Sequence, residues 1–328
     1  MSVFERCLEK CRARKGAVVY SDGEDRRVVS AAAKLIREGL VEPILIGDPE
    51  KVRAALQESG ETGVSLQVVN PYNPALLQHN AAEYMSIQKD KGKDISEEEA
   101  IKAVKNPLAA GALMVRRGEA EIGVAGNLSS TADVIRAGLR MVGTAAGSKT
   151  VSSFFFMLKD NNVCMFTDCA VIPEPTSAQL ADIAISTAGV YKRVMGDEAR
   201  VALLSFSTKG SAKHERVDKV RAALEEIKTR EPNLLVDGEL QLDAAVEPEV
   251  ARLKAPGSPV AGNANVFPSL EAGNIGYKIA QRFGGWTALG PLLQGFAHGW
   301  HDLSRGCSSD DIYKISVVGL GMNRGGQQ

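Results

Sequence analysis

The sequence predicts an α/β protein of two domains, each built around a largely parallel central sheet. Short runs of β-branched residues alternate with longer amphipathic stretches, a pattern typical of β–α–β units. At 328 residues the chain also exceeds the length at which single hydrophobic cores stop growing. We place the first domain at residues 1–147 and 290–328 and the second at 148–289, because the chain changes character past Gly147. Loops from both domains are then expected to line an active-site cleft between them.

The first domain contains four segments that we predict as strands. They are residues 17–20, 43–47, 66–69 and 121–126. An amphipathic helix follows the first strand and is capped within residues 22–25. Ser96 and Glu99 have the spacing of a capping box for a later helix, which Pro107 interrupts or kinks.

In the second domain, residues 152–158 and 163–172 are predicted as paired strands. Further strands are expected at 201–206 and 235–243, and a helix at 270–283. The sequence shows no internal repeat and no low-complexity segment.

The composition of the chain argues against several classes of binding partner. Apolar residues make up 44%, charged residues 24%, and the net charge is -1, so no electrostatic footprint for nucleic acid or an anionic membrane is expected. No apolar run approaches the ~20 residues needed to span a bilayer, and the first residues lack a signal-peptide core. Five cysteines without a Cys-x-x-Cys pair, and only four histidines, predict neither a disulfide framework nor a metal site. We therefore expect a cytoplasmic protein, with Cys7 and Cys11 packed in the core beside Phe4.

The segment of residues 302–311 concentrates reactive side chains near the C-terminus. Ser304, Arg305, Gly306 and Cys307 precede Ser308 and two carboxylates, of which Asp311 is the second. A guanidinium beside a hydroxyl suits a phosphorylated substrate, because its fork matches phosphate oxygens. The competing interpretation is a serine N-cap with acidic residues in the first helical turn, and the pattern alone favours it.

Residues 126–133 form a second candidate, a glycine at a strand end followed by a hydroxyl-rich helix start. Ser129, Ser130 and Thr131 could cradle an anion together with Arg136 in the next turn. An ordinary capped helix with an exposed arginine fits equally well.

Other motifs point to structure rather than chemistry. Residues 207–213 lack the glycine spacing of a Walker A loop, and Gly319–Gly321 is followed by too few residues for a dinucleotide site. The acids Asp237, Glu239 and Asp243 suggest solvated or hydrogen-bonded side chains more than a metal site. For Cys307, a partly buried structural thiol is more probable than a nucleophile.

Taken together, ordered segments along almost the whole chain resemble the phosphate acetyltransferase (phosphotransacetylase) family, most closely its short ethanolamine-utilisation branch. The segments that carry the resemblance are residues 106–115, 126–136, 150–153, 204–212, 237–241, 254–259, 273–278 and 302–307.

The resemblance implies reversible acetyl transfer: acetyl-CoA plus phosphate gives acetyl phosphate plus CoA. It also implies a homodimer, no metal held by protein ligands and no tightly bound cofactor, with coenzyme A as a substrate. By resemblance Asp311 is the base that takes the CoA thiol proton, and Ser304 positions that thiol. Arg305 and Arg136 bind acetyl phosphate, with Gly306, Cys307 and residues 129–131 beside the substrates.

A carboxylate of pKa ~3.9 is a weak base for a thiol of pKa ~8.5, so we expect Asp311 to be partly desolvated. Attack is expected to be direct, with no acyl-enzyme on Cys307.

Three departures from the family pattern stand out. Gln88 takes the place of a common arginine, and Asn263, after Gly262, takes the place of a lysine. The strand at Val266 is two residues shorter than usual. Their effect on activity is open, as is encapsulation in a bacterial microcompartment.

Three other functions fit parts of the sequence. One is transfer of a longer acyl group, such as butyryl. The second is an NAD-dependent dehydrogenase of related fold, against which the lack of a dinucleotide motif argues. The third is a catalytically weakened binding or shell-associated protein, which Gln88 keeps open.

Overall fold

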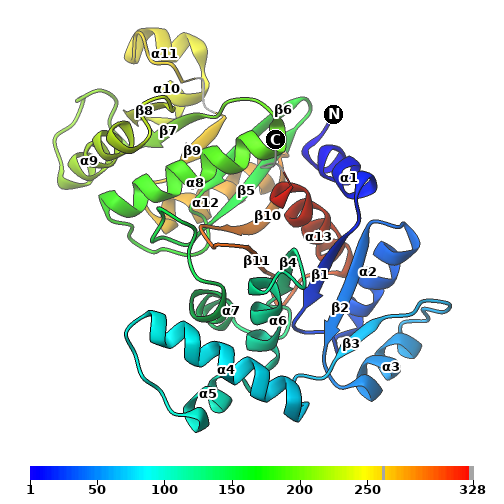
Figure 1. The fold of residues 1–328 in the computed structure, drawn as a ribbon. Helices are drawn as coiled ribbons and strands as arrows, with labels where there is room; N and C mark the ends of the chain where they lie inside the picture. The colour runs from blue at the N-terminus through cyan, green and yellow to red at the C-terminus, as the bar shows by residue number, and fades with distance from the viewer. Residues whose placement is uncertain (261–262, 325–328) are drawn as a thin grey trace. The chain divides into compact units, whose positions relative to one another are not determined.

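The computed structural model describes residues 1–260 and 263–324 (Figure 1). The chain divides into two compact units. The first unit comprises Phe4–Gly143 and Phe296–Arg324, and the second centres on Thr144–Gly295. No helix in the described part of the chain is long and apolar enough to span a membrane.

The first unit is built on a five-stranded sheet in the order β11-β4-β1-β2-β3, and every neighbouring pair is parallel. Its strands are β1 (Gly16–Tyr20), β2 (Val41–Ile46), β3 (Gln67–Val69), β4 (Ile122–Ala125) and β11 (Gly299–Asp302). Its helices are α1 (Val3–Ala13), α2 (Arg26–Arg37), α3 (Pro49–Glu58), α4 (Pro74–Asp90), α5 (Glu97–Val104), α6 (Pro107–Arg116), α7 (Thr131–Ala137), η1 (Gly138–Val142) and α13 (Ser309–Asn323).

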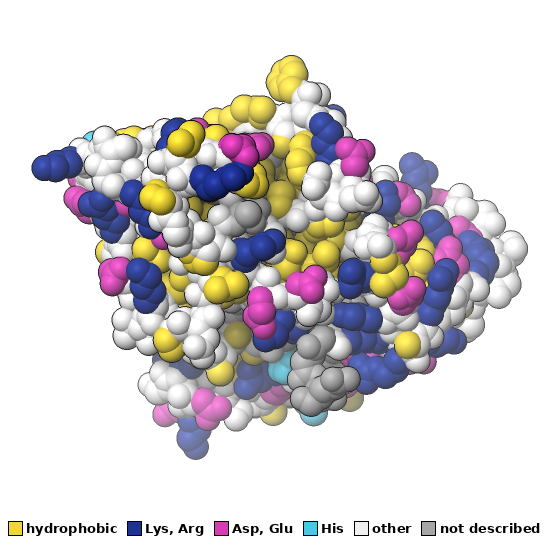
Figure 2. All heavy atoms as spheres, turned by 90° about the horizontal axis from the view of Figure 1, so that it is seen from above, with side chains coloured by type: hydrophobic (Ala, Val, Ile, Leu, Met, Phe, Trp, Pro, Cys, Tyr) yellow, Lys and Arg dark blue, Asp and Glu magenta, His cyan; other side chains and the backbone are white. Residues whose placement is uncertain are grey.

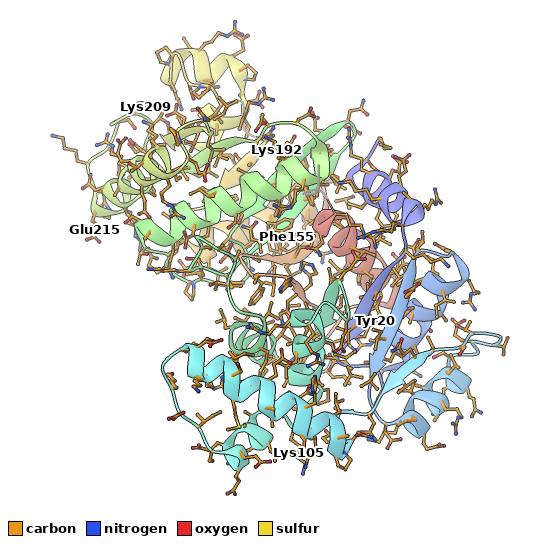
Figure 3. All side chains as sticks on the ribbon, in the orientation of Figure 1. Tyr20, Lys105, Phe155, Lys192, Lys209 and Glu215 are labelled. Atoms are coloured by element: carbon orange, nitrogen blue, oxygen red, sulfur yellow. The ribbon has the colours of Figure 1, made fainter. Side chains whose placement is uncertain are left out.

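Helices cover both faces of this sheet. Tyr20 of β1 points toward α13, where its hydroxyl lies 2.7 Å from the Ser316 hydroxyl (Figure 3). The preceding residue, Val19, faces α6, because a Cβ placed on Gly111 would lie 3.7 Å from a Val19 methyl group. Successive strand residues point to opposite faces, so α13 and α6 lie on opposite sides of the sheet.

The strand order reverses between β1 and β4. The chain adds β2 and β3 on one side of β1, and then places β4 and β11 on the other side. In open α/β sheets this topological switch point, outside the carboxyl ends of the strands, is where ligands bind.

The second unit contains a six-stranded sheet in the order β10-β5-β6-β9-β7-β8. Only β5 runs against its two neighbours, so this sheet is also largely parallel. Its strands are β5 (Ser152–Lys159), β6 (Asn162–Thr167), β7 (Arg200–Leu204), β8 (Leu235–Leu240), β9 (Ala264–Val266) and β10 (Thr287–Gln294). Its helices are α8 (Ser177–Met195), α9 (Glu215–Arg230), α10 (Leu242–Val246), α11 (Pro248–Lys254) and α12 (Leu270–Arg282).

The predicted α/β class with two largely parallel sheets is confirmed. The capping box of Ser96 and Glu99 forms, and Pro107 begins a new helix at its first turn. Two predicted strands are too long: β6 ends at Thr167, and β8 ends at Leu240, so that Asp243 lies in α10. The short strand at Val266 is the three-residue β9.

Candidate active site

Most of the predicted site residues lie in two loops at the carboxyl edge of the first sheet. One loop follows β4 and leads into α7, and the other follows β11 and leads into α13. Their parent strands are adjacent, and β4 is also the neighbour of β1 at the switch point. The site is therefore built where the topology alone would place a ligand.

Asp22, directly after β1, organises the loop that follows β4. Its carboxylate accepts hydrogen bonds from the N–H groups of Gly126 at 2.9 Å and Leu128 at 3.3 Å, and from the Ser129 hydroxyl at 3.4 Å. Burial raises the pKa of Asp22, and these hydrogen bonds act in the opposite direction. The carboxylate thus substitutes for the missing backbone partners of a buried turn.

Asp302, the last residue of β11, forms a second anchor beneath the same loop. Its Oδ2 accepts a 2.6 Å hydrogen bond from the Thr131 hydroxyl, and the side chain is buried. Burial, with a smaller contribution from the negative charge of Asp22, raises the pKa of Asp302 to about 6, although the hydrogen bond from Thr131 acts in the opposite direction. Gly126 has a φ of +105°, and a Cβ there would lie 2.2 Å from Asp302 Oδ1. Only glycine fits at that position.

The loop after β11 presents Ser304, Arg305 and Gly306 as exposed residues. The Gly306 N–H donates to Ser304 Oγ at 3.2 Å, and the Cys307 N–H donates to the Ser304 carbonyl at 2.9 Å. The turn is therefore closed on itself and fixes the Ser304 side chain. The Arg305 guanidinium makes no ion pair with any residue in the described ranges, so its donors are available to an anion.

Asp311 lies in the first turn of α13 as part of a complete capping box. The Ser308 N–H and hydroxyl each donate to Asp311 Oδ2 at 2.8 Å, and the Asp311 N–H donates to Ser308 Oγ at 3.1 Å. The N-cap interpretation of this segment is thus confirmed as structure. The expected partial desolvation of Asp311 is wrong, because the residue is exposed at the helix start.

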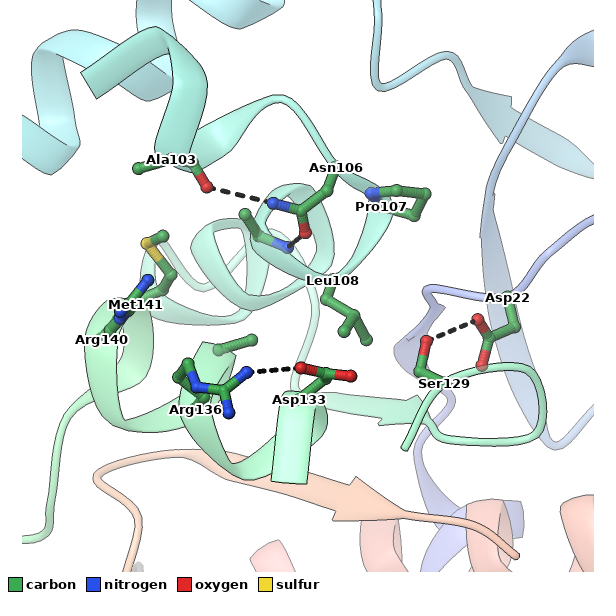
Figure 4. Close-up of a pocket in the computed structure, with 12 residues that line it drawn as sticks. Asp22, Ala103, Asn106, Pro107, Leu108, Ser129, Asp133, Arg136, Arg140 and Met141 are labelled. Atoms are coloured by element: carbon green, nitrogen blue, oxygen red, sulfur yellow. Dashed lines mark hydrogen bonds and ion pairs between the residues drawn. The ribbon is translucent and has the colours of Figure 1, made fainter. Parts of the chain in front are cut away.

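Arg136, on α7, lines a cavity of about 350 Å³ (Figure 4). It pairs with Asp133 one turn earlier, and both side chains are about half exposed. Arg140 lines the same cavity one helical turn beyond Arg136, and Ser129 lies across from them. Among the residues that the structure describes, Arg140 has no ion-pair partner.

The three predicted hydroxyls have separate tasks. Ser129 lines the cavity, Ser130 caps α7 by accepting from the Asp133 N–H, and Thr131 is bonded to Asp302. The structure therefore leaves only Ser129 facing the space where an anion could bind.

The cysteines are buried thiols. Cys7 and Cys11 are fully buried, and burial raises their pKa values to about 12 and about 11. Burial also raises the pKa of Cys307, a residue that is 7% exposed at the end of the site loop. The predicted core packing of Cys7 and Cys11 is confirmed. That Cys307 is a structural thiol stays a prediction, which its raised pKa favours because a thiol of raised pKa is a poor nucleophile.

The three acidic residues that the sequence offered as metal ligands are held in ion pairs. Asp237 pairs with Lys209, Glu239 with Arg221 at 2.8 Å, and Asp243 with Lys254 at 2.7 Å. In the described part of the chain no group of three or more His, Cys, Asp or Glu side chains could hold a metal ion.

The structure places two of the residues that depart from the family pattern, Gln88 and Asn263. Gln88 is buried on α4 and does not line the Arg136 cavity. Asn263 accepts a 2.7 Å hydrogen bond from the Arg200 N–H and so supports the start of β7. Gly262 lies outside the described residues.

The sequence reasoning did not single out Asp22, Arg140 or Asp302 as site residues. The available signal was positional, since Asp22 and Asp302 stand at the carboxyl ends of strands β1 and β11. Arg140 stands four residues after Arg136 and so lies on the same helix face.

Comparison with known sequences decides the family. The family described as phosphate acetyl/butaryl transferase matches residues 2–319. The chain belongs to this family. It is accordingly an acyltransferase.

Individual relatives agree with the family over nearly the full length. The phosphate acetyltransferase of Clostridium acetobutylicum is 43% identical over 326 residues, which are 97% of each chain. A phosphotransacetylase structure from Streptococcus pyogenes aligns with a TM-score of 0.92 at 41% identity and covers 98% of this chain and 99% of its own. The EutD phosphotransacetylase from Staphylococcus aureus aligns with a TM-score of 0.89 at 38% identity, with 98% of each chain covered. The predicted family is confirmed.

Proposed function

We infer that the chain is a phosphate acetyltransferase, which moves an acetyl group reversibly between coenzyme A and inorganic phosphate. The observation that carries this function is the identity of 43% over 97% of both chains with a relative of that name. The likeness to a EutD phosphotransacetylase supports a place in ethanolamine utilisation, and the cytoplasm is the compartment that we propose.

In the proposed mechanism Asp311 takes the proton of the CoA thiol. The sulfur then attacks the carbonyl carbon of acetyl phosphate, the bond between that carbon and the phosphate oxygen breaks, and phosphate leaves. Asp311 Oδ2 is occupied by Ser308, whereas Oδ1 has no partner among the described residues and is free to accept the proton. Ser304 holds the thiol by a hydrogen bond and forms no covalent bond.

The Asp311 carboxylate must gain proton affinity before it can accept the thiol proton, because an exposed carboxylate is a much weaker base than a thiolate. Bound substrates supply it in this proposal, since they exclude water from the exposed carboxylate and raise its proton affinity. Arg305 neutralises the negative charge that develops on the phosphate as the bond to the carbonyl carbon breaks.

The cavity beside Arg136 supports the binding of coenzyme A. It is larger than acetyl phosphate requires and falls in the range of small-molecule sites. Arg136 binds acetyl phosphate in this proposal, and Arg140 offers its guanidinium to a phosphate of CoA. Ser129 and Asn106 add polar groups to the wall.

We also propose that the protein is a homodimer. Helix α12 exposes Ile275, Ile279 and Phe283, which are 57%, 54% and 89% exposed and recur every four residues. Such a stripe on one helix face is unusual for a monomer and suits a second copy. Hydrophobic side chains also reach the surface among charged ones on the face shown in Figure 2.

The test is acetyl phosphate-dependent thioester formation on CoA, followed by absorbance. Wild type is expected to turn over, and Asp311→Asn and Arg305→Ala are expected to lose about 100-fold or more of kcat. Asp310→Asn is the matched control, since Asp310 stands in the same helical turn but pairs with Lys314.

Three outcomes would count against the proposal. A folded wild type that turns over neither acetyl nor butyryl phosphate would remove the enzyme function. A clear preference for butyryl phosphate would change the acyl group. An equal loss in Asp310→Asn would remove the special role of Asp311.

A further inference from the structure

One arginine binds the two loops of the site together. Arg27, in the first turn of α2, donates through Nη1 to the carbonyl oxygens of Arg305 and Cys307, each at 2.8 Å. Through Nη2 it donates to the Asn127 carbonyl at 3.1 Å. Its Nε and Nη2 also donate to the carboxylate of Asp25, the N-cap of α2.

These contacts use the whole guanidinium. An arginine side chain has five N–H donors in a fixed plane. Nη1 serves two carbonyls, Nη2 serves a carbonyl and Asp25, and Nε serves Asp25. No donor of Arg27 is left for a phosphate, in contrast to the guanidinium of Arg305.

The segments that Arg27 joins are far apart in the sequence. Asn127 belongs to the loop after β4, and residues 305–307 belong to the loop after β11. Arg27 itself follows β1, so one charge connects the loops of three adjacent strands. Backbone contacts of this kind fix the position of a loop without depending on its side chains.

Asp25 holds the guanidinium in this orientation. Burial opposes ionisation of Asp25, but hydrogen bonds from Arg27 outweigh that effect and lower its pKa. The Asp25 side chain also caps α2 by accepting from the Arg27 N–H at 2.8 Å. The pair is therefore anchored on a regular element rather than on a loop.

We propose that Arg27 is a positioning residue for acetyl transfer, which sets the turn carrying Ser304 and Arg305 against the loop after β4. The proposal rests on the proposed function. Arg27 does not touch substrate. It fixes the backbone from which Ser304 reaches the thiol and Arg305 reaches the phosphate.

The loss of Arg27 would affect the three carbonyl groups that accept hydrogen bonds from it. Removing the guanidinium leaves three backbone carbonyl oxygens without a charged donor, and hydrogen bonds from charged donors are stronger than those from neutral ones. Lysine cannot replace it, because its three donors radiate from one nitrogen and cannot reach acceptors on both loops. Loops released in this way lose the alignment that transfer requires, and misplacement by about 1 Å can cost 100-fold in rate.

The experiment compares Arg27→Ala and Arg27→Lys with the matched control Arg26→Ala. Arg26 is the exposed neighbour in the same helical turn. We expect kcat of both Arg27 variants to fall by about 10- to 100-fold, while Arg26→Ala stays near wild type. Millimolar guanidinium is expected to restore kcat of Arg27→Ala but not that of Arg305→Ala, because the cation can reoccupy the site between the carbonyls.

Hydrogen exchange on the same proteins separates positioning from general stability. Faster exchange in Arg27→Ala, confined to the amides of residues 126–131 and 304–308, supports the proposal. Wild-type kcat in Arg27→Ala, or a loss of kcat without guanidinium rescue and with faster exchange throughout α2 and α13, overturns it. If wild type itself shows no acetyl transfer, the proposed function fails, and the exchange pattern still decides whether Arg27 positions the loops.

Discussion

Ser308 and Asp311 hold each other at the start of α13. Two donors of Ser308 lie 2.8 Å from one carboxylate oxygen of Asp311, and the Asp311 N–H lies 3.1 Å from the Ser308 hydroxyl. The cap therefore fixes the rotamer of the proposed base and selects the oxygen that remains free. In the proposed mechanism this capping contact therefore also positions the base.

Replacing Ser308 with alanine is expected to lower both stability and turnover. Loss of an N-cap serine costs about 1 kcal/mol of unfolding free energy, and Asp311 loses one of its two donors. Thr176→Ala removes an equivalent capping box on α8 and should cost similar stability with unchanged kcat. Urea unfolding and the thioester assay measure the two effects. Equal kcat values in the two variants would contradict the link between cap and base.

Asp302 predicts a pH-dependent difference in stability. Burial raises its pKa from 3.8 to about 6, so the folded state holds the proton more tightly than the unfolded state. Ionisation of Asp302 therefore destabilises the fold progressively as the pH rises between these values.

The variant Asp302→Asn lacks this ionisation and can still accept from Thr131. Its stability relative to wild type is expected to increase as the pH rises, by at most about 3 kcal/mol. Urea unfolding of both proteins across this pH range measures the difference. A difference that does not change with pH would show that Asp302 does not titrate in this range.

Arg140 is expected to contribute to the binding of coenzyme A. Its guanidinium lines the cavity next to Arg136 and has no ion-pair partner among the described residues. Arg140→Ala should raise the KM for CoA about tenfold, the equivalent of one charge-assisted hydrogen bond, with a small change in kcat. Arg53→Ala removes an exposed arginine that pairs with Glu50 and serves as the control. An unchanged KM for CoA would exclude Arg140 from the binding site.

Cys307 should be dispensable for the chemistry. Its buried thiol has a raised pKa, and the proposed attack is direct. We expect Cys307→Ala to keep kcat within about threefold, because nucleophilic attack needs a thiolate that this residue does not readily form. Intact-protein mass spectrometry after incubation with acetyl phosphate tests the same point. An acetyl adduct that disappears in Cys307→Ala would establish an acyl-enzyme instead.

The apolar stripe on α12 predicts the oligomeric state. Ile279→Asp should convert a dimer into a monomer, because it places a charge in the middle of the stripe. Leu253→Asp is the control, since Leu253 is 84% exposed on α11. Light scattering after gel filtration gives the mass of each protein. A monomeric wild type, or a dimer that survives in Ile279→Asp, would rule out this interface.

The sequence predicted four of the five strands of the first sheet because each is short, apolar and bounded by turn residues, but it did not predict β11. β1 and β2 differ from the predicted ranges by only a few residues. β8 was predicted too long, since acidic residues continue past Leu240 although the backbone turns into α10. Alternation of residue type does not reveal where a strand leaves its sheet.

The site was predicted only in part. Ser304, Arg305 and Asp311 were found because they lie close together in the sequence. Asp302 was overlooked, and Arg27 was not considered, because their roles depend on contacts between segments 100 or more residues apart. The exposure of Asp311 was also missed, since burial is a property of the folded surroundings.

The position of β11 has a consequence for biosynthesis. β11 completes the first sheet by pairing with β4, although the second unit lies between them in the chain. At a synthesis rate of about 5–20 residues per second, the edge of β4 emerges roughly 10–35 s before its neighbour exists. An unpaired edge strand is a template for association with other chains. The nascent protein therefore passes through an interval in which it is vulnerable to aggregation and still lacks the segment that carries the proposed base.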